Sequence, residues 1–255
     1  MEIKPNEIYL GDCLELMQYI PNKSIDMILC DLPYGTTRNK WDSIIPLDNL
    51  WEQYKRIIKD NGAIVLTAQT PFDKVLGVSN LKMLKYEWIW EKDRSSGHLN
   101  AKKMPMKAHE NIMIFYKKTP IYNPQKTRGH KPSNVSGKRK KETTNYGHFE
   151  SLISGGQTDR YPRSVIKINV VNSQHNPLHP TQKPVALFEY LIKTYTNENE
   201  TVLDNCMGSG TTAVASINTN RNWIGIENDE TYFEVANKRI VGHMKAVNIN
   251  GTYSV

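Results

Sequence analysis

The sequence has few cysteines and no long apolar run. No stretch of eighteen consecutive apolar residues occurs and the mean hydropathy is −0.57, so no transmembrane helix is predicted. The first residues, MEIKPNEIYLGD, lack the charged and then apolar layout of a secretory signal. Cys13, Cys30 and Cys206 are odd in number and contain no CxxC pair, which argues against a disulfide framework or a zinc ribbon. We therefore expect a cytoplasmic protein without membrane association.

Metal-binding patterns are equally scarce. His175 and His179 are four residues apart, but Pro177 lies between them. Proline interrupts a helix, so these two histidines do not form a helical ligand pair. The sequence predicts no metal site.

The positive charge is concentrated in one segment. The chain has 255 residues, with 33 Lys and Arg against 26 Asp and Glu, giving a net charge of +7. Residues 117–141 contain nine of the basic residues and no acid. In the rest of the chain the 26 acidic residues therefore outnumber the remaining 24 basic residues. Because this segment is also rich in Pro, Gly, Ser and Asn, we interpret it as a basic arm or loop that meets a polyanion. The alternative is a solvated, partly disordered insertion.

Apolar runs alternate with segments of helical spacing along most of the chain. Strands are expected at 7–10, 25–31, 62–69, 86–92, 111–118, 201–205 and 223–227. Helices are expected at 11–20, 47–62, 183–196, 211–219 and 230–243. This alternation predicts an α/β protein with a mostly parallel, doubly wound sheet. The composition changes at about 117–178, which indicates an insertion in one domain of a length that can bury a core.

The segment VLDNCMGSGTT, residues 202–212, follows the pattern of a cofactor turn. A buried strand places Asp204 at its carboxyl end, and Gly208 and Gly210 allow a tight turn close to a ligand. Glu227 ends another expected strand about twenty residues later, where an acid suits a ribose hydroxyl pair. GxGxxG is not met and the lysine of a phosphate loop is absent, so a nucleoside cofactor such as S-adenosyl-L-methionine fits better. An ordinary strand-to-helix turn is the alternative.

The segment CDLPYG, residues 30–35, directly follows the expected strand 25–31. Asp31 would project from the carboxyl end of that strand, Pro33 would stiffen the turn, and Tyr34 would present a flat face. A carboxylate, a rigid backbone carbonyl and an aromatic ring suit an exocyclic amine on a flat base. A tight strand-exit turn with a packed tyrosine is the alternative.

These two motifs resemble those of amino-methylating DNA methyltransferases. DLPY is similar to [DNS]-P-P-[YFW], and VLDNCMGSGTT to VLDPFxGSGTT; GDCLELM, HPTQKPVALFEYLI and GIENDETYFEVANKRI match further family segments. The catalytic motif precedes the cofactor motif, as in the β-class enzymes, and the resemblance covers most of 7–116 and 179–242. It implies a Rossmann-like class I methyltransferase fold, circularly permuted. Residues 1–116 would form the catalytic half, 117–178 a target-recognition insertion and 179–255 the cofactor half.

The resemblance also implies roles for individual residues. Catalytic positions would be Asp31, Leu32, Pro33 and Tyr34. Cofactor-binding positions would be Asp12, Cys13, Asp31, Thr181, Gln182, Lys183, Asp204, Asn205, Met207, Gly208, Ser209, Gly210, Thr211, Glu227 and Asn228. DNA contacts are expected from Lys126, Arg128, Lys131, Lys138, Arg139, Lys140 and Lys141. His109 and Glu110 also match a recurrent family element, but we interpret that pair as structural.

Both motifs depart from the family pattern, at three positions in all. Leu32 replaces the first proline of the catalytic motif, where the family uses only the main-chain carbonyl. Asn205 and Cys206 replace Pro-Phe in the cofactor motif.

The implied reaction is transfer of a methyl group from S-adenosyl-L-methionine to the N6 amino group of adenine in DNA, by base flipping and direct in-line transfer. Cytosine N4 is an alternative target, although β-class enzymes for it usually carry Ser in place of Asp31. An RNA substrate and a catalytically silent nucleic-acid-binding homologue are further alternatives. Expected partners are double-stranded DNA, a second copy in a homodimer and a cognate restriction endonuclease. The recognition sequence does not follow from these residues.

Overall fold

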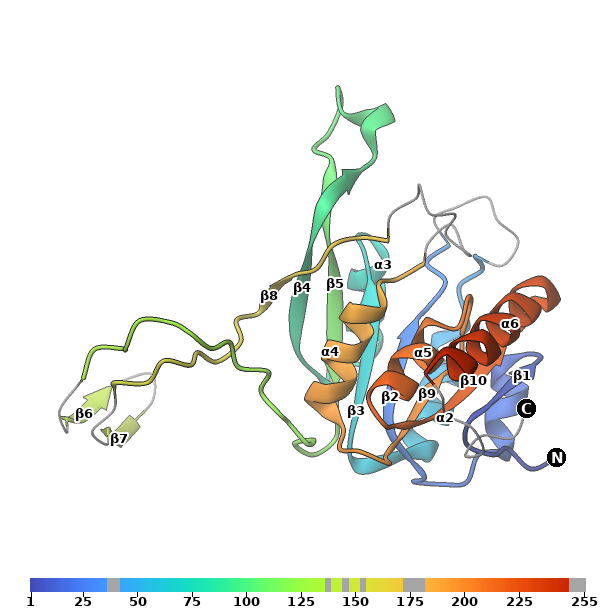
Figure 1. Cartoon of the computed structure of the whole chain (residues 1–255), viewed down its shortest axis with the longest axis horizontal. Helices are drawn as coiled ribbons and strands as arrows, with labels where there is room; N and C mark the ends of the chain where they lie inside the picture. Colours follow the sequence, from blue (N-terminus) through green and yellow to red (C-terminus); the bar gives the residue numbers. More distant parts are fainter. Residues whose placement is uncertain (36–41, 136–138, 144–146, 152–154, 172–181, 248–255) are drawn as a thin grey trace. The chain divides into compact units, whose positions relative to one another are not determined.

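The fold is built on one eight-stranded mixed sheet (Figure 1). The computed structural model describes residues 1–35, 42–135, 139–143, 147–151, 155–171 and 182–247, with backbone only for 139–143 and 147–151. The strand order is β1-β10-β9-β2-β3-β5-β4-β8. The strands are β1 (Glu7–Leu10), β2 (Ile25–Asp31), β3 (Ile58–Ala68), β4 (Leu84–Ser96), β5 (Lys107–Phe115), β8 (Val165–Lys167), β9 (Thr201–Asp204) and β10 (Asn222–Glu227).

The chain reverses its direction of winding in the middle of this sheet. Strands β1, β10, β9, β2 and β3 are mutually parallel, whereas β5 is antiparallel to both β3 and β4. Strands β2 and β9 are neighbours at the centre of the sheet. The strand that follows β2 in the chain, β3, is added on one side of this pair, and the strand that follows β9, β10, is added on the other side. In open α/β sheets, ligands bind outside the carboxyl ends of the strands at such a switch point. The doubly wound, mostly parallel architecture predicted from the sequence is confirmed.

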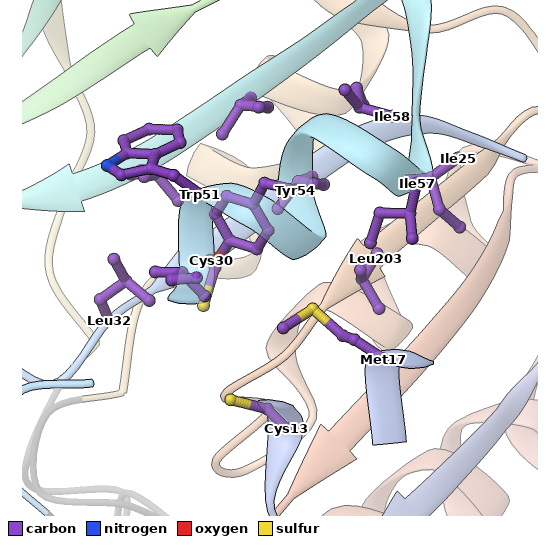
Figure 2. Packing of buried hydrophobic residues seen from close by; sticks show 14 of the residues in the cluster. Cys13, Met17, Ile25, Cys30, Leu32, Trp51, Tyr54, Ile57, Ile58 and Leu203 are labelled. Carbon is purple, nitrogen blue, oxygen red and sulfur yellow. The ribbon is translucent and has the colours of Figure 1, made fainter. Parts of the chain in front are cut away.

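Helices cover both faces of the sheet. They are α1 (Cys13–Leu16), α2 (Leu47–Ile57), α3 (Phe72–Ser79), α4 (Val185–Tyr195), α5 (Thr211–Asn218) and α6 (Glu230–Ala246), with short 3-10 turns η1 (Met17–Tyr19) and η2 (His98–Asn100). Alternate residues of β2 supply the two cores: Ile28 packs with α2 and α3, and Leu29 packs with α4. Figure 2 shows the first core, where Trp51 and Tyr54 of α2 lie close to Cys30. This period of two explains why both faces of β2 carry apolar side chains.

Helix α2 is shorter than its sequence pattern predicts. The expected helix 47–62 ends at Ile57, because Ile58 is extended and pairs with Ile25 as the first residue of β3. Gly62, the last residue of the expected helix, lies within that strand. A Cβ atom there would be 2.7 Å from the Asp26 carbonyl oxygen. Glycine is therefore required by close backbone approach within the sheet.

Strands β4 and β5 form a long hairpin that extends past the carboxyl end of β3 (Figure 1). Ala68, the last residue of β3, pairs with Asn111, and the hairpin continues to a pairing of Ser96 with Lys107. We name residues 93–109 the finger. Every residue of the finger is exposed.

Residues Pro124–Arg163 form a compact unit of their own, and the rest of the chain forms the other unit. The smaller unit contains the antiparallel pair β6 (Arg139–Thr143) and β7 (Gly147–Ser151). Thr127 and Arg160 form a backbone bridge within it. Among the described residues, no helix has the length and apolarity to cross a membrane.

Candidate active site

A cleft of about 660 Å³ lies at the switch point of the sheet. Its walls come from the segments that follow three parallel strands: Asp31–Tyr34 after β2, Asp204–Ser209 after β9, and Glu227–Asn228 after β10. The size falls within the roughly 300–1,000 Å³ range of pockets for small molecules. The fold therefore brings the two sequence motifs, which are far apart in the chain, into one cavity.

Asp31 accepts hydrogen bonds on both of its carboxylate oxygens. Its Oδ1 accepts hydrogen bonds from the hydroxyl groups of Tyr34, at 2.6 Å, and Thr67. Its Oδ2 lies 2.5 Å from the Nζ of Lys183, and 23% of the side chain is exposed. A carboxylate oxygen has about two acceptor sites, so Oδ2 keeps one for a further donor.

Asp31 ends a chain of four alternating charges. Lys183 also lies 3.3 Å from Oε2 of Glu110, whose Oε1 accepts a hydrogen bond from Lys92. Burial alone lowers the pKa of Lys183, but Asp31 and Glu110 together raise it above its ordinary value. Burial raises the pKa of Glu110, but the ammonium groups of Lys183 and Lys92 outweigh it, and the pKa lies below its ordinary value. Lys183 and Glu110 are therefore both charged at neutral pH.

Tyr34 is half-buried, and its ring forms part of the cleft wall. The ring stacks on Phe72 with centroids 5.4 Å apart, and the Nζ of Lys183 lies 5.7 Å from its centroid. The backbone N–H groups of Tyr34 and Gly35 both donate to Asp42 at 2.8 Å. Burial, with the neighbouring Asp31, holds the pKa of Tyr34 well above its ordinary value. The tyrosine is consequently a neutral, positioned hydrogen-bond donor.

The turn after β9 is organised by the buried carboxylate of Asp204. Its Oδ1 accepts from the backbone N–H of Cys206 at 3.0 Å, and its Oδ2 accepts from the Thr212 hydroxyl. Burial raises the pKa of Asp204 to about 6. Gly210 has a φ of 81°, a left-handed conformation at the start of α5 that suits glycine. These contacts fix the shape of the turn before any ligand is present.

Glu227 is held by backbone donors on both oxygens. Oε2 accepts from the N–H of Gly208 at 2.6 Å, and Oε1 accepts from the N–H groups of Asn228 and Asp229 at 3.0 and 2.9 Å. Burial raises the pKa of Glu227, although these backbone donors oppose the shift. Asp12 also lies in the cleft wall, where one of its oxygens caps α1 by accepting from Leu14 at 2.7 Å.

The two atypical residues of the cofactor motif have partners in the core. Asn205 accepts a 2.5 Å hydrogen bond from the hydroxyl of Tyr54. The neighbouring thiols of Cys13 and Cys30, together with burial, hold the pKa of the Cys206 thiol well above its ordinary value. The three cysteines, distant in the sequence, therefore meet beside the cleft as free thiols.

Several residues of the cleft were missed by sequence reasoning. Glu110 was interpreted as structural, and its ion pair with Lys183 instead joins it to the Asp31 cluster. The sequence analysis does not single out Lys92 or Thr67, because only the pairing of separate strands brings Lys92 to Glu110 and Thr67 to Asp31. Arg239 of α6 donates to the carbonyl oxygen of Ser209 at 2.9 Å and supports the glycine turn. No local sequence signal marks these contacts.

The remaining expected site residues are distributed as follows. Leu32, Pro33, Cys13, Gln182, Met207 and Thr211 line the cleft. Thr181, His175, His179 and Lys138 lie outside the described residues. For Arg139, Lys140 and Lys141 only the backbone of β6 is described. In the part of the chain that the structure describes, no group of three or more His, Cys, Asp or Glu side chains is arranged to hold a metal ion.

The expected DNA contacts of the smaller unit differ in their surroundings. Lys126 forms a 3.0 Å ion pair with Asp159, and its Nζ lies 4.3 Å from the ring centroid of Tyr161. Arg128 and Lys131 are exposed. Lys126 is therefore occupied within the unit, whereas the other two side chains face solvent.

Comparison with known proteins identifies the family. Residues 25–238 match the N6_N4_Mtase family model, described as DNA methylase. This chain belongs to that DNA methylase family. Its class of reaction is therefore methyl transfer to DNA, and the donor used by the family is S-adenosyl-L-methionine. The resemblance predicted from the DLPY and VLDNCMGSGTT motifs is confirmed.

Individual relatives cover most of the chain. The type II methyltransferase M.HinfI of Haemophilus influenzae is 27% identical over 92% of this chain and 68% of its own length. The DNA adenine methyltransferase YhdJ of Escherichia coli (strain K12) is 29% identical over 90% of this chain and 81% of its own length.

Solved structures share the fold. The complex of M1.HpyAVI with S-adenosyl-L-methionine has a TM-score of 0.62 at 24% identity, covering 92% of this chain and 98% of that chain. The cytosine-N4-specific PvuII DNA methyltransferase has a TM-score of 0.68 at 15% identity, covering 98% and 95% of the two chains. The Rossmann-like methyltransferase fold is thus shared by enzymes of this kind.

Proposed function

We propose that this DNA methylase is site-specific and transfers the methyl group to the N6 amino group of adenine. The observation that carries the proposal is the position of Asp31. Its carboxylate lies in the same cleft as the Asp204 turn and Glu227, and its Oδ2 keeps an acceptor site. A similar protein is named a DNA adenine methyltransferase.

The chemistry of the cleft suits S-adenosyl-L-methionine. Glu227 and Asp12 would accept hydrogen bonds from the ribose hydroxyl groups and the adenine amino group, and the Asp204–Thr211 turn would hold the methionine part. Oε2 of Glu227 accepts from one backbone donor only, so it keeps an acceptor site for a ribose hydroxyl group. When bound, the cofactor supplies an electrophilic methyl group on a sulfonium. Asp31 and Asp204 make the surrounding wall favourable to that positive charge.

Asp31 and the Leu32 carbonyl would orient the adenine amine. The N6 lone pair is delocalised into the ring, which makes N6 a poor nucleophile. If each N6–H donates to one of these acceptors, the nitrogen moves toward a tetrahedral geometry and its lone pair is directed for in-line attack. Asp31 also stabilises the positive charge that develops on N6 and is a nearby acceptor for the proton that N6 releases. Lys183, Tyr34 and Thr67 hold the Asp31 carboxylate in place during this step.

The contacts of Lys183 add a second role to the cofactor binding that the family resemblance implied. Its Nζ contacts Asp31 and Glu110, and its carbonyl oxygen accepts a 3.4 Å hydrogen bond from Thr211 of the cofactor motif. We therefore assign Lys183 the positioning of Asp31. Because the ammonium group is 7% exposed and lies between two carboxylates, it is well suited to that task.

The target base would have to leave the duplex. A stacked base cannot reach a cleft at the end of a sheet, so the adenine would be extruded into it. The ring of Tyr34, which forms part of the wall, is an aromatic surface for the extruded base.

The test is a direct assay of base modification. Purified protein is incubated with S-adenosyl-L-methionine and unmethylated DNA of mixed sequence, and the nucleosides are analysed by mass spectrometry after nuclease digestion. We expect N6-methyladenine from the wild type and a loss of at least about 100-fold in rate for Asp31→Asn. Asp48→Asn, an exposed acid of α2, is the matched control and should retain activity.

Three other outcomes of this assay would contradict parts of the proposal. N4-methylcytosine would contradict the proposed target. Cofactor binding in calorimetry without a modified base in DNA would contradict the proposed activity and favour an RNA substrate or a silent nucleic-acid-binding homologue. Equal loss in both variants would remove Asp31 from its proposed role.

A further inference from the structure

The finger combines positive charge with exposed apolar side chains. It contains Arg94, Lys102, Lys103 and Lys107, while Asp93 is its only acid. Leu99 at the tip is 88% exposed, the highest value among the large hydrophobic side chains that the structure describes as exposed. A single exposed leucine is common on protein surfaces, but Met104 and Met106 of the same finger are also exposed, at 54% and 39%. Several exposed apolar side chains on one cationic hairpin are typical of a surface that binds a partner.

The base of the finger is attached to the active-site cleft. Ser96 and Lys92 line the cleft, and the Nζ of Lys107 donates a 3.1 Å hydrogen bond to Gln69, which follows β3 and also lines the cleft. From the pairing of Asn111 with Ala68 to Lys107, the hairpin extends about 13 Å past the end of β3. A partner that reaches the finger therefore also reaches the cleft.

The tip has a defined shape. Gly97 has a φ of 88°, which reverses the chain at the start of η2. The backbone N–H groups of Lys103 and Met104 both donate to the carbonyl oxygen of Asn100, at 2.8 and 3.0 Å. Leu99 is thus presented on a hydrogen-bonded turn, which reduces the conformational entropy that binding would cost.

We propose that the finger binds the duplex beside the target base. Leu99 enters the space that the extruded adenine leaves in the base stack, and Lys102 and Lys103 contact the phosphates next to it. The cations match the charge of the DNA backbone, and the apolar tip matches the flat, apolar faces of the bases above and below the gap. Apolar side chains inserted between bases are a known way to hold DNA in a deformed state. This inference rests on the proposed function, because it requires a base that leaves the duplex.

The first test compares Leu99→Ala with Leu81→Ala. Leu81 is also exposed, at 64%, but it follows α3 outside the finger. The substrate is a duplex containing the preferred sequence, identified beforehand from the methylated positions in treated genomic DNA. On the fully paired duplex, we expect Leu99→Ala to lower kcat/KM about tenfold or more, and Leu81→Ala to leave it unchanged. On a duplex with a mismatch opposite the target adenine, extrusion is easier, so we expect Leu99→Ala to recover most of its activity.

Two outcomes of this comparison would overturn the inference. One is equal activity of Leu99→Ala and wild type on the paired duplex. The other is a loss that the mismatch does not restore, together with a lower molecular mass of Leu99→Ala in light scattering. That result would make the finger a contact between two copies of the chain.

The second test separates the finger from the proposed activity. DNA binding is measured as a function of salt for Lys102→Ala/Lys103→Ala and for the control Lys82→Ala/Lys85→Ala, at the opposite end of the hairpin. We expect the salt slope to fall by up to about 2 in the finger variant only. This result would support DNA binding by the finger independently of catalysis. If the wild type methylated no DNA, the proposed function would be overturned, but the binding result would still stand. An unchanged slope in the finger variant overturns the finger contact.

Discussion

At the scale of single residues, the alternating charges from Lys92 to Asp31 determine the electrostatics of the cleft. Each of the four side chains comes from a different segment, and three of them are about one-tenth exposed or less. The two positive and two negative charges cancel, so the cluster is stable only as a set. Removing one member leaves a buried charge without its partner, which costs more than the intact pair contributes.

Glu110→Gln tests this interdependence. It leaves Lys92 and Lys183 with only one acid between them, and we expect the free energy of unfolding to fall by roughly 2–4 kcal/mol. The double variant Lys92→Met/Glu110→Gln restores charge balance and should lose less than the two single variants together. Urea denaturation at neutral pH measures all three. Strict additivity would show that the charges are independent.

Asp204 supplies a test of pH dependence. Its folded pKa of about 6 lies above its ordinary value of 3.8. Between these values the unfolded chain loses a proton that the folded chain retains, so this group makes folding less stable as the pH rises from about 4 to 6, with no further change above 6. Asp204→Asn lacks this dependence. We expect the stability of the variant relative to wild type to rise by about 2–3 kcal/mol across that window, as measured by denaturation at each pH.

A constant difference between the two proteins would contradict the elevated pKa. The comparison must be made between variant and wild type, because Glu110 and Asp73 have lowered pKa values and act in the opposite direction. Those acids contribute stability above their unfolded pKa, and it is lost as the pH falls through their folded pKa.

Residues that follow a strand were predictable, and residues that meet through strand pairing were not. Asp31, Asp204 and Glu227 end apolar runs, so their common location follows from a parallel sheet. Glu110 and Lys92 meet because β4 and β5 are antiparallel neighbours. Nothing in the local pattern of either segment specifies that partner or its direction.

At the scale of secondary-structure elements, the same division applies. All eight strands of the sheet except β8 were expected close to their observed positions. Helix α3, the length of the β4–β5 hairpin and the end of α2 were not predicted. Ile57 and Ile58 continue the apolar spacing of α2, but Ile58 is drawn into β3 by its pairing with Ile25. Tertiary contacts decided where the helix ended.

Two glycines in different elements should respond oppositely to alanine. In β3, a Cβ at Gly62 would meet the Asp26 carbonyl oxygen and the Ile58 side chain at 2.7 Å, so we expect Gly62→Ala to lower stability by about 1–3 kcal/mol. In α6, Gly242 is exposed with open space around it. Gly242→Ala should raise stability by about 0.5–1 kcal/mol. Thermal or urea unfolding checks both, and a shift of the same sign would contradict this account.

At the scale of the whole molecule, the positive charge has a specific distribution. The chain outside residues 117–141 carries more acids than bases, so DNA affinity should depend strongly on the smaller unit. Arg128→Ala/Lys131→Ala removes two solvent-facing cations of that unit. We expect weaker binding and a salt slope lower by up to about 2, measured by fluorescence anisotropy. Lys126→Ala is the comparison, and it should change the slope less because Lys126 is paired with Asp159.

The sheet is assembled from distant parts of the chain, which has a consequence for how the enzyme could be divided. Asp31 comes from the segment before Pro124–Arg163, whereas Asp204 and Glu227 come from the segment after it. A break within that unit would give two fragments, each with half of the site. Neither fragment could methylate DNA until β9 docked against β2. Activity would then follow the product of the two fragment concentrations, so the divided enzyme would report the simultaneous presence of both halves in a cell.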